Sequence, residues 1–302
     1  MIGKRCGSGL WILVAVTLLI GCGPVTGKVQ TQGPGADEVR PAYRLQKVIE
    51  VEGRQGVAAD GNRYFVSGST ELFVYSKTGE LLAANRDPFS ALESPANHIG
   101  DIDVHAGEIY AGIENFTGGH STDIQIGVYD AETLEYRRAI EWEPDSGQTE
   151  VSAVAIDGER NAIWMTDWGN GRYLYRYDLD TGRYSGRVHL RPVPQWQQGI
   201  VAHEGSLFIT ADDGDADLDE PDSLWRVSPE EGASAAYVEL ELAFSELRRA
   251  GEVEGVTVDE VAGELVVLSN RGARIELGMP SGFYPGYDRE IHELYVYSMT
   301  DR

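Results

Sequence analysis

Residues 152–182 of this chain read SAVAIDGERNAIWMTDWGNGRYLYRYDLDTG. The stretch contains three short apolar runs, at 152–156, 163–166 and 174–177, separated by turns rich in Gly, Asn and Asp. Runs of four or five residues between such turns are typical of antiparallel strands and are too short for ordinary helices. The stretch therefore predicts a small β-meander, and the rest of the chain repeats it.

The meander recurs five times. Its first strand pairs a polar or small residue with a short apolar run, at 55–59, 100–104, 152–156, 198–202 and 254–258. Corresponding residues in successive copies are 45, 52, 46 and 56 positions apart, counted at Val57, Ile102, Val154, Ile200 and Val256. This is the spacing of four-stranded propeller blades. The sequence thus predicts an all-β, five-bladed β-propeller.

The fourth strands indicate how the ring closes. An outer strand follows each of the first four copies, at 80–85, 135–140, 184–190 and 236–240, whereas the fifth copy has only its third strand before Arg302. Tyr43 to Val51 alternates apolar and polar residues just before the first copy, so we expect it to complete the last blade. A six-bladed ring, with one degenerate blade built after Asn270, is the alternative.

The N-terminal segment has the features of an export signal. Lys4 and Arg5 precede an apolar run from Leu10 to Ile20, which is short for a membrane span. The run ends in Leu-Ile-Gly-Cys at 19–22, which resembles the bacterial lipobox and implies a diacylglyceryl, palmitate-type anchor on Cys22. We expect a signal peptide at 1–21, a flexible tether at 22–42 and one domain at 43–302. The protein would then lie in the cell envelope, on the periplasmic or the surface face.

Charge and cysteine content narrow the possible partners. The chain has 49 acidic and 25 basic residues, a formal net charge of −24, which argues against nucleic acid and anionic headgroups as ligands. Its only cysteines are Cys6 and Cys22, so the folded part is expected to lack disulfides and thiol chemistry. We expect a monomer that contacts membrane lipid only through Cys22.

Polar-Gly pairs open three of the five first strands: Gln55-Gly56, Gln198-Gly199 and Glu254-Gly255. With the repeat, they make residues 43–301 similar to bacterial propellers of the NHL, SMP-30/gluconolactonase and glutaminyl cyclotransferase groups. The Asn-Glu-Leu-Glu segment of the cyclotransferases is absent. The resemblance therefore implies a fold, and it does not carry an activity with it.

First strands line the channel of a propeller, so their polar residues are the first candidates for a site. Strand alternation places on the channel face Gln55, Gly100, Ser152, Gln198 and Glu254, and two residues earlier His98, Glu150, Trp196 and Glu252. We expect a Ca²⁺ held by Gln55, Glu150, Gln198 and Glu254, or else a water-filled channel. His98, Glu150 and Glu254 are the candidate catalytic residues. Asp101 and Asp103 face away unless a bulge turns one of them inward.

Polar pairs also follow four of the second strands and would surround one entrance of the channel: Glu114-Asn115, Asp167-Trp168, Asp212-Asp213 and Asn270-Arg271. We expect a ligand to contact Asn115, Asp167, Trp168, Asp212, Asn270 and Arg271, although such residues are also common in turns. Acids alternate at Asp213, Asp215, Asp217 and Asp219, either as an improvised Ca²⁺ loop or as an acidic surface loop.

The long segment 270–293 carries Arg271, Arg274, Tyr284 and Tyr287. Arginines with aromatic rings suit a carboxylate or a sugar, unless the segment is only a lid over the channel. Three functions follow: a binder of a small anionic or sugar-like ligand, a metal-dependent hydrolase, lactonase or cyclotransferase, and a scaffold that binds protein partners by its outer blade edges. No Gly-x-Ser-x-Gly, His-Glu-x-x-His or phosphate-loop motif is present.

Overall fold

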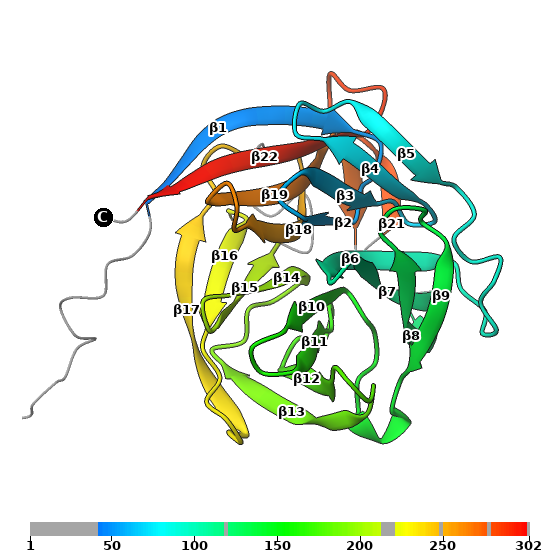
Figure 1. Cartoon of the computed structure of the whole chain (residues 1–302). Coiled ribbons are helices and arrows are strands. Elements are labelled where there is room, and N and C mark those ends of the chain that lie inside the picture. Colours follow the sequence, from blue (N-terminus) through cyan, green and yellow to red (C-terminus); the bar gives the residue numbers. More distant parts are fainter. Residues whose placement is uncertain (1–41, 118–119, 213–220, 248–249, 277–278, 301–302) are drawn as a thin grey trace, which may run out of the picture. The chain divides into compact units, whose positions relative to one another are not determined.

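Antiparallel strands account for almost all of the regular structure (Figure 1). This computed structural model describes residues 42–117, 120–212, 221–247, 250–276 and 279–300, all within one unit of residues 40–302. The predicted signal peptide, Cys22 and the predicted tether up to residue 41 lie outside the described residues, and so do the acids at 213–219. In the described part of the chain, no helix is long and apolar enough to span a membrane.

The described strands form five four-stranded antiparallel units, each a meander of consecutive strands except the last. The first two are β2 (Gly56–Ala59), β3 (Arg63–Ser67), β4 (Leu72–Ser76) and β5 (Leu81–Asn85), and β6 (His98–His105), β7 (Glu108–Thr117), β8 (His120–Asp130) and β9 (Tyr136–Glu141). The third is β10 (Ala153–Asp157), β11 (Ala162–Thr166), β12 (Tyr173–Asp178) and β13 (Tyr184–Arg191). The fourth is β14 (Gln197–His203), β15 (Ser206–Ala211), β16 (Ser223–Val227) and β17 (Ala235–Ala243).

The fifth unit combines the two ends of the described chain. Its order is β1 (Ala42–Val51), β22 (Ile291–Thr300), β19 (Glu264–Arg271) and β18 (Gly251–Asp259). β1 pairs antiparallel with β22 from Ala42 opposite Thr300 to Val51 opposite His292. The strand before the first copy therefore completes the last unit, as its alternation predicted.

The inner strands β2, β6, β10, β14 and β18 form a closed ring, in which each contacts the inner strands of the two neighbouring units. This arrangement confirms the prediction of an all-β propeller. β13 and β17 also pair in parallel, which joins the third and fourth units into one eight-stranded sheet. The segment after Asn270, which could have formed a sixth blade, instead forms the two-stranded hairpin β20 (Ala273–Glu276) and β21 (Met279–Phe283).

Apolar side chains pack between neighbouring units. One buried cluster contains Trp164 of the third unit with Ile200 and Leu207 of the fourth. Another joins Val51 and Leu294 of the closing unit to Val57 of the first unit. Full burial of such side chains contributes about 1.5–3 kcal/mol each, so the contacts between units are a main source of stability.

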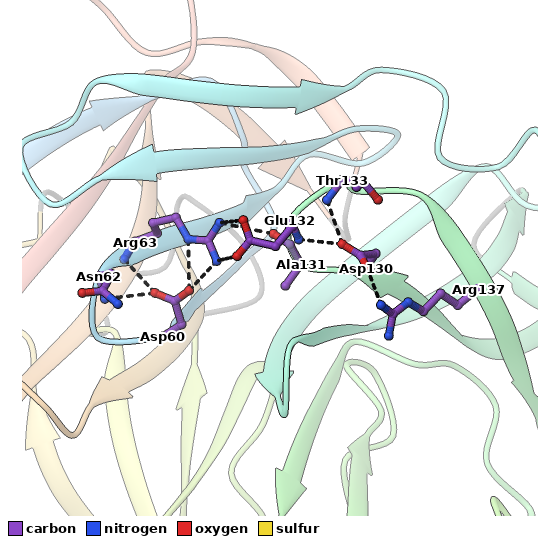
Figure 2. Close-up of polar contacts among 8 residues, drawn as sticks. All are labelled: Asp60, Asn62, Arg63, Asp130, Ala131, Glu132, Thr133 and Arg137. Carbon is purple, nitrogen blue, oxygen red and sulfur yellow. Dashed lines mark hydrogen bonds and ion pairs between the residues drawn. The ribbon is translucent and has the colours of Figure 1, made fainter.

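Polar contacts at the periphery link the first and second units (Figure 2). Arg63 on β3 donates to Asp60 and to Glu132, both at 2.7 Å, and Glu132 lies in the turn after β8. In the same turn Asp130 accepts the N–H of Glu132 at 2.8 Å and pairs with Arg137. Because the Glu132 side chain is 76% exposed, its ion pair contributes at most about 1 kcal/mol.

A bulge places Asp101 at the centre of the ring. The pairing of β6 with β7 shifts register between Ile99 and Ile102, and the side chain of Asp101 is completely buried. Its Oδ1 accepts the N–H of Val57 at 2.9 Å, and its Oδ2 accepts those of Ile200 at 3.1 Å and Val256 at 3.5 Å. One carboxyl group thus connects the inner strands of four units.

The position of the Asp101 carboxyl group explains why two of the polar-Gly pairs contain glycine. A Cβ on Gly56 would lie 2.6 Å from Asp101 Oδ1, and a Cβ on Gly255 would lie 2.4 Å from the same atom. Any larger residue at either position would displace the central carboxyl group. Gly56 and Gly255 therefore allow the inner strands to pack closely against the carboxyl group at the centre of the ring.

Candidate functional site

A cavity of about 300 Å³ lies where the inner strands begin. All five units contribute to it, and its lining residues are Arg54, Gln55, Ser69, His98, Phe116, Glu150, Trp168, Gln198, Glu252, Glu254, Ile275, Pro280 and Glu290. The three candidate catalytic residues and the four candidate metal ligands are all among them. The structure therefore brings the candidate catalytic residues and the candidate metal ligands to one site, which we call the mouth cavity, whereas Gly100, Ser152 and Trp196 are not among its lining residues.

Arg54 is the one Lys or Arg side chain among the described lining residues, and acidic groups surround it. Its guanidinium lies 3.2 Å from Glu290, 3.5 Å from Glu254 and 3.8 Å from Glu252. Burial raises the pKa of Glu254 well above its usual range, and the charge of Arg54 partly offsets the effect. The cavity thus has an excess of carboxyl groups over cations.

Glu150 and Asp167 are a second group of acids with raised pKa values. Burial raises the pKa of Glu150 to about 8, and the Glu114 carboxylate adds to the shift. Burial also raises the pKa of Asp167 to about 7, although hydrogen bonds from Tyr175, Thr149 and the Glu150 backbone act in the opposite direction. At neutral pH a protonated Glu150 can donate a hydrogen bond into the cavity.

His98 is held by a buried carboxylate. Its Nδ1 lies 3.1 Å from Glu114 Oε1, and the Glu114 side chain is completely buried at the strand pair of β6 and β7. Glu114 Oε2 accepts the backbone N–H of Val151 at 2.9 Å, which fixes the carboxylate from the third unit. The imidazole therefore has a defined orientation at the wall of the cavity.

Two of the four predicted calcium ligands, Glu254 and Gln198, have other hydrogen-bond partners. Glu254 Oε1 accepts from Asn270 Nδ2 at 2.6 Å beside Arg54, and Gln198 donates to Asp212 at 2.7 Å. Within the described residues, no three His, Cys, Asp or Glu side chains are grouped so that they could hold a metal ion. A cation bound through Glu254 would have to displace both an amide donor and a guanidinium, so this donor set does not fit Ca²⁺.

Of the rim residues predicted to bind a ligand, only Trp168 lines the mouth cavity. Asp212 supports the wall, because it accepts from Gln198 and, at 3.4 Å, from Trp168 Nε1. Asn270 supports it in the same way through Glu254 and the carbonyl of Arg54. Asp167 is buried and accepts from Tyr175 at 3.2 Å.

The remaining predicted contacts lie outside the cavity lining. Asn115 donates to Thr122 at 3.4 Å across the β7–β8 hairpin. Arg271 makes two bonds to Glu293, at 2.8 and 2.9 Å, and its guanidinium lies over the ring of Tyr287.

Arg274 lies 3.5 Å from Glu276, and its guanidinium lies over the ring of Tyr284. The long segment instead contributes Ile275 and Pro280, from the β20–β21 hairpin, to the mouth cavity. With Glu290, the segment therefore contributes three side chains to the wall of the cavity.

Sequence reasoning missed Arg54, Ser69, Phe116 and Glu290 as site residues. Ser69 had a readable signal, because it follows the second strand of the first copy at the point where the other copies have their polar rim pairs. The other three follow no repeated position. Phe116 lies near the end of β7, and Arg54 and Glu290 lie in the segments that follow β1 and precede β22.

A second cavity, of about 470 Å³, lies at the opposite ends of the inner strands. It is lined by the turns between first and second strands, whose charged side chains pair locally, as in Arg160 with Asp157 at 2.8 Å. Burial raises the pKa of Asp103 to about 7 there, where it accepts the N–H of Ile156 at 2.7 Å. Since the lining residues that the structure describes include no Trp, Tyr or Phe, this end is the weaker candidate for a ligand site.

Comparisons with known proteins add little to this picture. No protein-family model and no curated protein matches the sequence. Among solved structures, a chain of hydrazine synthase from Kuenenia stuttgartiensis aligns with a TM-score of 0.44 and 13% sequence identity. The alignment covers 71% of this chain and 63% of the hydrazine synthase chain, so this chain spans less than two thirds of the length of the synthase chain. A likeness at this level carries no argument about function.

Proposed function

We propose that this protein is a lipid-anchored propeller of the bacterial cell envelope that binds a small, hydroxyl-rich ligand in the mouth cavity. The observation that supports the proposal is the cavity itself, to which all five units contribute hydrogen-bonding side chains and the third unit also contributes Trp168. Enclosed sites with a few convergent polar groups and an aromatic wall are typical of small-molecule binding. Carboxyl and amide groups bind hydroxyls, while an indole ring stacks on the apolar face of a sugar.

The charges of the cavity favour a sugar-like ligand over the anionic one that the sequence also allowed. Arg54 already lies beside three glutamates, so it has little charge left for an added anion. Arg271 is committed to Glu293 in the same way. An anionic ligand would add a negative charge next to these carboxylates, and the repulsion would oppose binding.

Replacing Trp168 with alanine tests the ligand site. We expect binding of the best ligand to weaken at least tenfold, because loss of one buried aromatic contact costs about 1.5–3 kcal/mol. The measurement is calorimetric titration with a panel of monosaccharides, disaccharides, polyols and sugar acids. Tyr237→Ala is the matched control, since Tyr237 is 83% exposed on β17. Tighter binding of sugar acids than of neutral sugars, or no binding by any of them, would contradict the proposal.

The lipid anchor is tested through the two cysteines of the sequence. In cells fed labelled palmitate, we expect the protein to be labelled and to partition into detergent, and Cys22→Ala to abolish both. Cys6→Ala is the control, since Cys6 would leave with the signal peptide, and we expect it to retain the label. Equal labelling of wild type and the Cys22→Ala variant would show that another residue carries the lipid. No labelling of the wild-type protein would show that it has no such anchor.

A further inference from the structure

Three side chains of the first and second units at the mouth cavity have the functional groups that nucleophilic catalysis needs. Ser69 and His98 both line the cavity, and Glu114 lies behind His98 as a fully buried carboxylate. The backbone of Ser69 is joined to the residue that follows His98, because the carbonyl of Ser69 accepts the N–H of Ile99 at 2.8 Å. A hydroxyl, an imidazole and a buried carboxylate in this order are the parts of an acyl-transfer triad.

The contacts of Glu114 determine what His98 can do. One carboxylate oxygen is engaged by the Val151 amide at 2.9 Å, and the other faces His98 Nδ1 at 3.1 Å. Because an ionised carboxylate is only an acceptor, the proton of a neutral imidazole is placed on Nδ1. His98 Nε2 then has its lone pair free to accept a proton.

Ser69 lies in the turn between β3 and β4 and is partly exposed to the cavity. No hydrogen bond joins its Oγ to His98 in the described residues, and in ligand-free enzymes such bonds often form only when substrate binds.

We propose that Ser69, His98 and Glu114 form a nucleophile, general base and positioning residue that hydrolyse a small carboxylic ester without a metal. Ser69 Oγ bonds to the ester carbonyl carbon while His98 Nε2 takes the hydroxyl proton. The bond from that carbon to the alcohol oxygen breaks, and the alcohol leaves with the proton from His98. Water then adds to the acyl carbon while His98 takes one of its protons. The bond from that carbon to Ser69 Oγ breaks, Oγ takes the proton back from His98, and the carboxylic acid leaves. The inference rests on the proposed function only in using the same cavity.

The test is active-site labelling of the full-length protein with a small fluorophosphonate, which does not require the natural substrate. Ser69 Oγ would form a bond to phosphorus, with loss of fluoride, and peptide mass spectrometry would locate the adduct. We expect labelling at Ser69, its loss in Ser69→Ala, and unchanged labelling in Ser185→Ala, where the serine is exposed on β13. No adduct, or an adduct at another residue, would overturn the proposal.

Further variants separate chemistry from folding. We expect His98→Ala to slow labelling at least a hundredfold and added imidazole to restore part of the rate, because imidazole can enter the space left by the side chain. Glu114→Gln keeps an acceptor for the Val151 amide, and we expect labelling at least tenfold slower without a lower melting temperature. Glu114→Asp, which retains the charge, should recover part of that loss. If Ser69 were labelled at the same rate in wild type and in His98→Ala, the triad would be overturned. Saccharide binding is measured separately, so the proposed ligand site is tested independently of the labelling result.

Discussion

Replacing Asp101 with alanine is expected to lower the free energy of unfolding by about 3–5 kcal/mol, because several buried donors lose their acceptor at once. The N–H groups of Val57, Ile200 and Val256 come from three different units and converge on this single carboxyl group. Leaving a buried N–H without an acceptor costs about 1–3 kcal/mol, and these three N–H groups would lose the Asp101 carboxyl group together.

Urea unfolding followed by circular dichroism would measure the effect. Asp180→Ala is the matched control, since Asp180 lies exposed in the turn after β12, and we expect it to change stability by less than about 0.5 kcal/mol. Asp101→Asn should fall between wild type and alanine, because the amide keeps one acceptor oxygen and presents an N–H₂ where the other oxygen was. Equal stability of wild type and Asp101→Ala would show that the inner strands are held without the central carboxyl group.

The position of Asp101 could not be predicted from the sequence. Strand positions followed from apolar runs and turn residues, and the closing strand followed from the alternation of Tyr43 to Val51. Strict alternation, however, placed Asp101 away from the channel. Register shifts occur in β6 at Asp101, in β14 near Gln198 and in β18 near Glu254. A bulge adds one residue to one strand, so it reverses the faces beyond it, and single-sequence periodicity does not locate it.

The candidate site was predictable to the extent that it lies on repeated positions. His98, Glu150 and Glu254 were found because they precede or open first strands, and they meet in one cavity. Arg271 was assigned to a ligand because it is an arginine in a long loop, but Glu293 on the adjacent strand binds it. Such pairing across strands depends on register, which the repeat does not specify for an insertion.

Val51→Asp is expected to cost about 3–5 kcal/mol of stability, because it places a carboxylate among apolar side chains at the closure of the ring. Val51 is 7% exposed and packs in the cluster that contains Val57 and Leu294. Val48→Asp, on the same strand, is the matched control, since Val48 is 43% exposed and its substitution should cost less than about 1 kcal/mol.

Both variants keep the same backbone pairing of β1 with β22, so the difference between them measures the effect of burial at the closure of the ring, separately from strand propensity. If the closing strand contributed only an outer edge, the two substitutions would destabilise the protein equally. A large difference in their urea midpoints would instead show that β1 seals the core between the last unit and the first.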